Sequence, residues 1–135
     1  MDSFLLALAI IIGFFVVIRL FVWITGKMKT GKKIGPFSGE IGERIQKGDK
    51  LLLYFYTPSC GACKAMTPVI DEMKKEKNNV YKINLTRDYT IGKIFGVMGT
   101  PATILVNNSK IDQYILGARS EKFLRNLTTE MKDVL

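Results

Sequence analysis

The sequence has 135 residues, which is enough for one domain and a short additional segment. It has two cysteines and no histidine, and its 20 basic and 12 acidic residues give a formal net charge of +8. The absence of histidine excludes Cys/His and Ser/His catalysis. Two cysteines are too few for a structural zinc site or an iron–sulfur cluster within one chain, so we expect no metal and no bound cofactor.

The positive charge is concentrated near the N-terminus. From Pro36 onward the chain carries 15 basic and 11 acidic residues, so this part has only a small excess of positive charge. It also lacks a dense stripe of lysine and arginine with interleaved aromatic residues, which is the pattern typical of nucleic-acid binding. We therefore expect no nucleic-acid partner.

Residues 4–25 form an apolar run with Arg19 as its only charged residue. About 20 such residues are needed to cross a bilayer as a helix, so we interpret residues 1–26 as a transmembrane anchor. A cleaved signal peptide is one alternative, but no basic residue precedes the run and no small-residue cleavage site follows it. A buried core helix is another alternative. Against it, apolar residues lie on all sides of the predicted helix and not on one face.

Residues 27–36 are rich in lysine and glycine and are expected to tether the anchor to a domain at residues 37–135. The four lysines, at positions 27, 29, 32 and 33, all follow the apolar run. The positive-inside rule then places the domain in the cytoplasm of a single-pass cell-membrane protein, with an extracytoplasmic domain as the alternative. The same lysines would also suit anionic lipid headgroups.

The domain begins with a predicted helix at residues 40–47, which Gly48 ends, and a buried strand at residues 51–56. A helix starting at Cys60 follows, with Pro68 expected to kink it. Further along we expect a strand at 80–85 and a short helix at 88–95. The patterns then predict a hairpin of strands 103–106 and 112–116, joined by a polar turn at 107–110. Ser120 is expected to cap a final helix, whose apolar positions are Phe123, Leu124, Leu127, Met131 and Val134.

The two cysteines, Cys60 and Cys63, lie where the buried strand gives way to a helix. The unpaired N–H groups of a first helical turn favour a thiolate, so Cys60 is the expected nucleophile. Cys63, one turn further on, can close a disulfide with Cys60 or release a mixed disulfide that Cys60 forms. Two inert cysteines, or a purely structural disulfide, are the alternatives. The structural disulfide would close too small a loop to restrict the unfolded chain much.

Over residues 37–135 the sequence resembles the thioredoxin superfamily. The features that match, in the same order, are the C-x-x-C pair Cys60 and Cys63, Pro68 in the following helix, Gly99-Thr100-Pro101, and Gly117. The resemblance implies an α/β thioredoxin fold, a central mixed sheet flanked by helices, here preceded by one N-terminal transmembrane helix. It also implies a cis peptide bond before Pro101.

The resemblance further implies a substrate-binding surface beside the cysteines. Thr100 would offer its backbone N–H and C=O groups to an extended substrate segment. Small residues would complete a flat docking surface: Gly61, Ala62, Gly99, Gly117 and Ala118.

Three positions depart from the usual pattern of this superfamily. Ser59 and Ala62 replace the usual tryptophan and proline around the first cysteine, and Tyr54 replaces a buried acid behind the second. Lys82 matches a buried lysine of the superfamily. The resemblance therefore leaves water, Lys82 or Tyr54 to assist deprotonation of Cys63.

Together these features predict a membrane-anchored thiol–disulfide oxidoreductase that acts on protein disulfides, most simply as a reductant. Its electrons would come from a thioredoxin reductase or a membrane electron carrier. The alternative is a membrane-tethered binding module of the same fold with redox-silent cysteines. Redox direction depends on the relative stability of thiolate and disulfide, which the sequence pattern does not determine.

Overall fold

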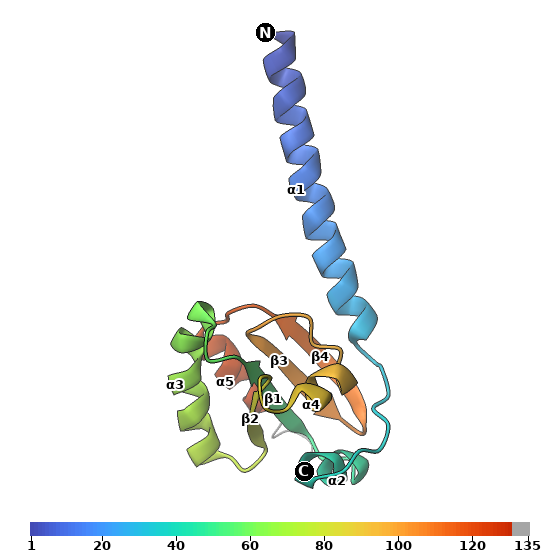
Figure 1. Cartoon of the computed structure of the whole chain (residues 1–135), viewed down its shortest axis with the longest axis vertical. Helices are drawn as coiled ribbons and strands as arrows, with labels where there is room; N and C mark the ends of the chain where they lie inside the picture. The colour runs from blue at the N-terminus through green and yellow to red at the C-terminus, as the bar shows by residue number, and fades with distance from the viewer. Residues whose placement is uncertain (131–135) are drawn as a thin grey trace.

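A four-stranded sheet forms the centre of the domain, and one long helix projects from the domain's edge (Figure 1). The computed structural model describes residues 1–130. The elements, in chain order, are α1 (Asp2–Lys29), α2 (Glu40–Gln46), β1 (Leu51–Tyr56), α3 (Gly61–Glu76), β2 (Val80–Asn84), α4 (Tyr89–Ile94), β3 (Ala102–Asn107), β4 (Lys110–Leu116) and α5 (Glu121–Glu130).

The strands lie in the order β2-β1-β3-β4. β1 is parallel to β2 and antiparallel to β3, and β4 is antiparallel to β3. The sheet is therefore mixed, with helices on both faces, which confirms the expected fold class. Its central strand β1 is the strand that leads into the cysteine pair.

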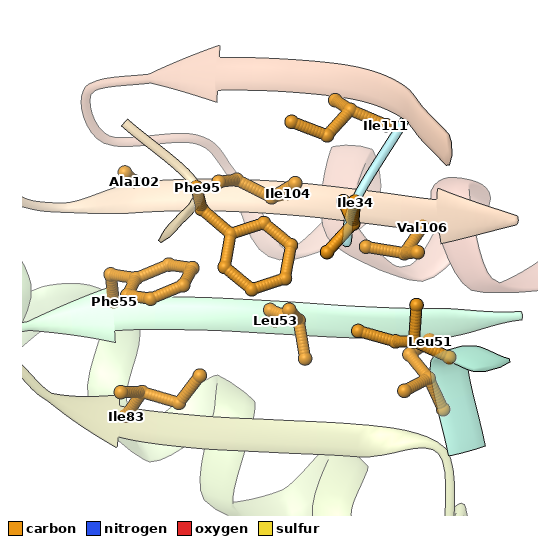
Figure 2. Packing of buried hydrophobic residues seen from close by; sticks show 11 residues of the cluster. Ile34, Leu51, Leu53, Phe55, Ile83, Phe95, Ala102, Ile104, Val106 and Ile111 are labelled. Carbon is orange, nitrogen blue, oxygen red and sulfur yellow. The ribbon is translucent and has the colours of Figure 1, made fainter. Parts of the chain in front are cut away.

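Successive residues of β1 point to opposite faces of the sheet, so this strand contributes to two separate cores. Leu52 and Tyr54 pack on the face covered by α3 and α5, together with Met66, Ile70, Met73, Leu124 and Leu127. Leu51, Leu53 and Phe55 pack on the opposite face, which α2 and α4 cover. Figure 2 shows this second core, with Phe55 beside Phe95. Burial on both faces explains why β1 reads as a continuous apolar run.

The hairpin between β3 and β4 is tighter than the sequence indicated. Asn107 and Lys110 pair directly, so the turn consists of Asn108 and Ser109 alone and β4 begins at Lys110 instead of Asp112. Both turn residues have positive φ, 49° and 60°. A two-residue turn of this kind matches the twist of the flanking strands.

Helix α1 is longer than the predicted anchor, since it continues through Lys27 to Lys29. Its most apolar 18-residue window has a mean hydropathy of 2.9 and no buried residue, so α1 is long and apolar enough to cross a membrane. A signal sequence near an N-terminus would have the same properties.

The segment expected to be a tether is attached to the sheet. Gly31 donates a backbone hydrogen bond to the Ile111 carbonyl (2.6 Å), Ile111 donates to Lys32 (3.0 Å), and Ile34 donates to Ser109 (2.8 Å). Ile34 is only 5% exposed and belongs to the core on the α2 and α4 face. Residues 31–34 therefore cover the outer edge of β4, which would otherwise be open.

Helix α5 begins as expected, because the Ser120 hydroxyl accepts a hydrogen bond from the Phe123 backbone N–H (3.3 Å). Leu124 and Leu127 are buried, whereas Phe123 is exposed. Met131 and Val134, two of the predicted apolar positions of this helix, lie outside the described residues.

Candidate active site

Cys60 and Cys63 lie at the start of α3 and form a disulfide. Cys60 is the N-cap, with an extended backbone, so the helix begins at Gly61 and not at Cys60 itself. The backbone N–H of Cys63 donates to Cys60 Sγ at 3.1 Å. A helix N-terminus that directs an N–H at this sulfur favours the thiolate when the pair is reduced, as the sequence indicated.

The two sulfurs differ in their access to solvent. Cys60 is partly exposed, whereas Cys63 is 2% exposed and belongs to the buried side of α3. An external disulfide can therefore reach Cys60 first. Cys63 lies behind Cys60 and is bonded to it in the disulfide.

The peptide bond between Thr100 and Pro101 is cis, as the resemblance implied. The Pro101 carbonyl accepts a hydrogen bond from Gly117 N–H (2.8 Å), so the end of β4 is held next to this loop. The Thr100 hydroxyl lies 3.4 Å from the hydroxyl of Thr57, which directly follows β1. Thr57 was not a predicted site residue, because nothing in its local pattern indicates this contact.

The small residues expected to form a docking surface are accessible. Gly61, Ala62 and Ala118 are exposed, Gly99, Thr100 and Gly117 are partly exposed, and Pro101 is buried. Two exposed apolar side chains flank these residues in the chain: Met98 (62% exposed) and Leu116 (37%).

The segment carrying Ala118 is held against the active-site helix. The backbone N–H of Arg119 donates to Met66 Sδ at 3.4 Å, and Met66 is a buried residue of α3. The surface of small residues therefore spans α3, the loop before β3 and the segment after β4, and these are elements far apart in the chain.

Tyr54 lies buried beneath the cysteine pair. Its hydroxyl donates to the Cys63 carbonyl (3.2 Å) and is 3.3 Å from the Thr67 hydroxyl, which itself donates to the same carbonyl (2.8 Å). Burial raises the pKa of Tyr54, which favours the protonated phenol that donates to the Cys63 carbonyl. Thr67, one turn after Cys63, is a second residue that the sequence analysis did not identify.

Lys82 is engaged elsewhere. Its Nζ forms a salt bridge with Asp71 (2.9 Å) and lies 5.1 Å from the centroid of the Tyr56 ring. The Lys82 side chain thus contacts Asp71 and Tyr56, and no contact with Cys63 is found among the described residues. The lysine charge lowers the pKa of Tyr54, but the larger effect of burial raises it.

Pro68 lies inside α3, one residue after Thr67, as the sequence indicated. Its ring removes one backbone N–H from the helical ladder. Within residues 1–130, no three Cys, Asp or Glu side chains are grouped so that they could hold a metal ion.

Removing the Tyr54 hydroxyl tests whether it transfers a proton to Cys63. Tyr54→Phe keeps the ring and leaves Thr67 bonded to the Cys63 carbonyl, so we expect a loss of about 1 kcal/mol in unfolding free energy. We expect that the phenol does not transfer the proton, so turnover should fall by less than about tenfold. A group that acts as a general acid or base would contribute roughly 10²–10⁴-fold. Disulfide reduction kinetics and denaturant unfolding measure the two effects. A larger fall in turnover, at unchanged folding, would show that the phenol moves the proton.

Comparisons with known proteins agree with this arrangement. The Thioredoxin family model matches residues 37–130. A thioredoxin of Haemophilus influenzae is 31% identical over 83 residues, which cover 59% of this chain and 78% of the relative. The NADPH-dependent thioredoxin reductase 3 of Arabidopsis thaliana is 29% identical over 80 residues, which cover 56% of this chain and 15% of that protein.

A solved structure gives the same fold. A mutant thioredoxin from Halobacterium salinarum superimposes with a TM-score of 0.61 at 22% identity, covering 78% of this chain and 98% of that one. The family match includes every element of the domain from α2 to α5, together with both cysteines and the Thr100–Pro101 loop. The chain therefore belongs to the thioredoxin family and is a thiol–disulfide oxidoreductase, and its Cys60 and Cys63 form a disulfide at the start of α3.

Proposed function

We propose that this protein is a membrane-anchored reductant of protein disulfides. The observation that carries the proposal is the unequal placement of the two sulfurs at the start of α3. Cys60 is partly exposed and accepts an N–H from the first helical turn, while Cys63 is buried behind it. This arrangement supports an attacking cysteine and a resolving cysteine with separate roles.

In the proposed reaction, the Cys60 thiolate attacks one sulfur of the substrate disulfide. The substrate S–S bond breaks, a mixed disulfide forms, and the other substrate sulfur leaves as a thiolate that takes up a proton. Cys63, as a thiolate, then attacks Cys60 Sγ and releases the second substrate sulfur, which also takes up a proton. Two electrons and two protons pass to the substrate, and the Cys60–Cys63 pair becomes a disulfide.

The Cys60–Cys63 disulfide must then be reduced again by an external donor of two electrons, with uptake of two protons. We propose a thioredoxin reductase or a membrane electron carrier as the donor. The similarity to part of a plant protein named as a thioredoxin reductase supports a donor of the first kind.

We propose that the substrate segment binds across Thr100, whose N–H and C=O groups would pair with it as a neighbouring strand would. Gly61, Ala62, Gly99, Gly117 and Ala118 would give the segment room to approach Cys60, and Pro101 would shape the loop. The exposure of the glycines and alanines supports this role. A surface with few large side chains would accept many different substrates.

The anchoring role is assigned to α1. Its apolar length and the lack of burial over its apolar window support a membrane span, and the lysines that follow the apolar run support a domain on the cytoplasmic side. A cytoplasmic domain would act as a reductant, because thiols there are kept reduced. An extracytoplasmic domain is the alternative, and it would fit reduction of exported proteins or disulfide formation.

The reduction potential tests the direction of the reaction. We expect the Cys60–Cys63 pair of the full chain, in detergent micelles, to equilibrate at about −270 mV, near the reducing end of the family range. Glutathione buffers with mass-spectrometric counting of alkylated thiols measure this value. A potential nearer −120 mV would identify an oxidant and would favour the extracytoplasmic orientation.

A further inference from the structure

The last turn of α1 is attached to the catalytic domain. Lys29 Nζ donates a hydrogen bond to the Gly96 carbonyl and lies 4.5 Å from the centroid of the Tyr114 ring. Lys27, in the same turn, instead lies over Trp23 of its own helix (4.9 Å). One of the two lysines therefore holds the domain and the other does not.

This attachment leads directly to the substrate loop. The Tyr114 hydroxyl donates to the Gly96 carbonyl and accepts from the Met98 N–H, both at 3.4 Å. Gly99, Thr100 and Pro101 follow Met98 without interruption. A short series of contacts thus connects the end of α1 to the loop beside the cysteines.

Residues 31–34 provide a second attachment, through the backbone hydrogen bonds to β4 described above. The two attachments lie at different positions, one at Gly96 and Tyr114 and the other at Ser109 and Ile111, at the start of β4. Two separated contacts oppose rotation of the domain about the helix end. The domain therefore has a defined orientation relative to α1.

The attachment lies close to the end of the apolar run. Lys29 is four residues beyond Thr25, which is about 6 Å along a helix. The headgroup layer on each side of a bilayer is roughly 5–8 Å thick. If α1 spans the membrane, the Gly96–Met98 segment therefore lies at headgroup level, and the exposed Met98 side chain suits that apolar–polar boundary.

Figure 1 shows that α1 leaves from the same end of the domain as the start of α3, where Cys60 lies. The last turn of α3 and the Asn78–Asn79 turn lie at the opposite end. Because α3 has 16 residues, these two ends are about 24 Å apart along the helix. If α1 spans the membrane, the active site is thus directed toward the membrane and the Asn78 turn away from it.

We propose that the active site faces the bilayer surface and acts on disulfides of integral membrane proteins, in segments that lie within the headgroup layer. This inference rests on the proposed membrane anchoring. A soluble substrate would have to enter the narrow space between the domain and the bilayer. A membrane-embedded partner presents its cysteines at the required height and at a high effective concentration.

The orientation is tested with the full chain in vesicles of phosphatidylcholine and phosphatidylglycerol that carry a nitroxide on the headgroup. A fluorophore is attached either to Cys60 in Cys63→Ser, or to position 78 in Cys60→Ser/Cys63→Ser/Asn78→Cys. We expect the fluorophore at Cys60 to be quenched several-fold more strongly than the one at position 78. Equal quenching, or stronger quenching at position 78, overturns the inference. Failure of the chain to float with the vesicles overturns the anchoring proposal itself.

Lys29→Ala and Lys27→Ala, each made in both labelled backgrounds, separate the docking contact from general charge effects. Both variants remove one positive charge from the same turn. Lys29→Ala is expected to reduce the difference in quenching between the fluorophore at Cys60 and the fluorophore at position 78. Lys27→Ala is expected to leave this difference unchanged. Identical behaviour of the two variants overturns the role of the Lys29 contact.

The substrate class is tested with two transmembrane peptides in the same vesicles without nitroxide. One carries a disulfide loop directly outside the apolar segment, and the other carries the same loop on a 30-residue Gly/Ser spacer, which adds about 30 Å. We expect the wild-type chain to reduce the near loop several-fold faster. Equal rates, or faster reduction of the distant loop, overturn the proposed preference.

Discussion

Replacing Cys63 with serine is expected to turn the enzyme into a covalent trap for its substrates. Cys60 remains partly exposed and can still attack, but a serine hydroxyl does not attack the resulting mixed disulfide at neutral pH. Turnover should fall by roughly 10³-fold or more, the scale expected when a catalytic nucleophile is lost. Non-reducing electrophoresis and mass spectrometry should then show adducts at Cys60.

Cys60→Ser is the informative comparison, because it leaves only the buried cysteine. Cys63 is 2% exposed, so this variant should be equally inactive but should form no adducts. Ser59→Ala, next to Cys60 and exposed, should leave turnover unchanged. Equal trapping by both cysteine variants would reverse the assigned roles, and trapping by neither would support a redox-silent binding module.

The cysteine pair and the order of the elements could be predicted because their signals are local. A continuous apolar run, a change to helical periodicity and a C-x-x-C pair at the junction are all adjacent in the chain. The cap at Ser120 was predicted in the same way, since a cap involves residues only three apart.

Two of the features that were missed depend on contacts between distant segments of the chain. Residues 31–34 contact β4 through backbone groups, and a lysine- and glycine-rich sequence gives no sign of that contact. Helix α1 also continues three residues beyond the expected anchor, because the sequence shows where apolarity ends and not where the helix ends. The contact of Thr57 with Thr100 spans 43 residues and has no periodic pattern to reveal it.

Gly42→Ala should destabilise the domain strongly, although alanine normally favours a helix by about 1 kcal/mol over glycine. Gly42 is buried in α2, and a Cβ there would overlap the backbone carbonyl of Phe37. Phe37 cannot yield easily, because its ring packs edge-on against Phe95 (6.2 Å between centroids), which in turn contacts Phe55. We expect the unfolding free energy to fall by about 3 kcal/mol, at the upper end of the range for overpacking.

Gly92→Ala is the matched control, since Gly92 is also a buried glycine in a short helix of the same face. Its Cβ would meet Leu85 Cδ2 at 2.5 Å, the end of a flexible side chain that can rotate away. The unfolding free energy of Gly92→Ala should therefore fall by less than about 1 kcal/mol. Denaturant unfolding of the full chain in detergent micelles measures both variants. Equal losses would mean that the segment before α2 is free to move, and that the core on this face does not fix the position of Phe37.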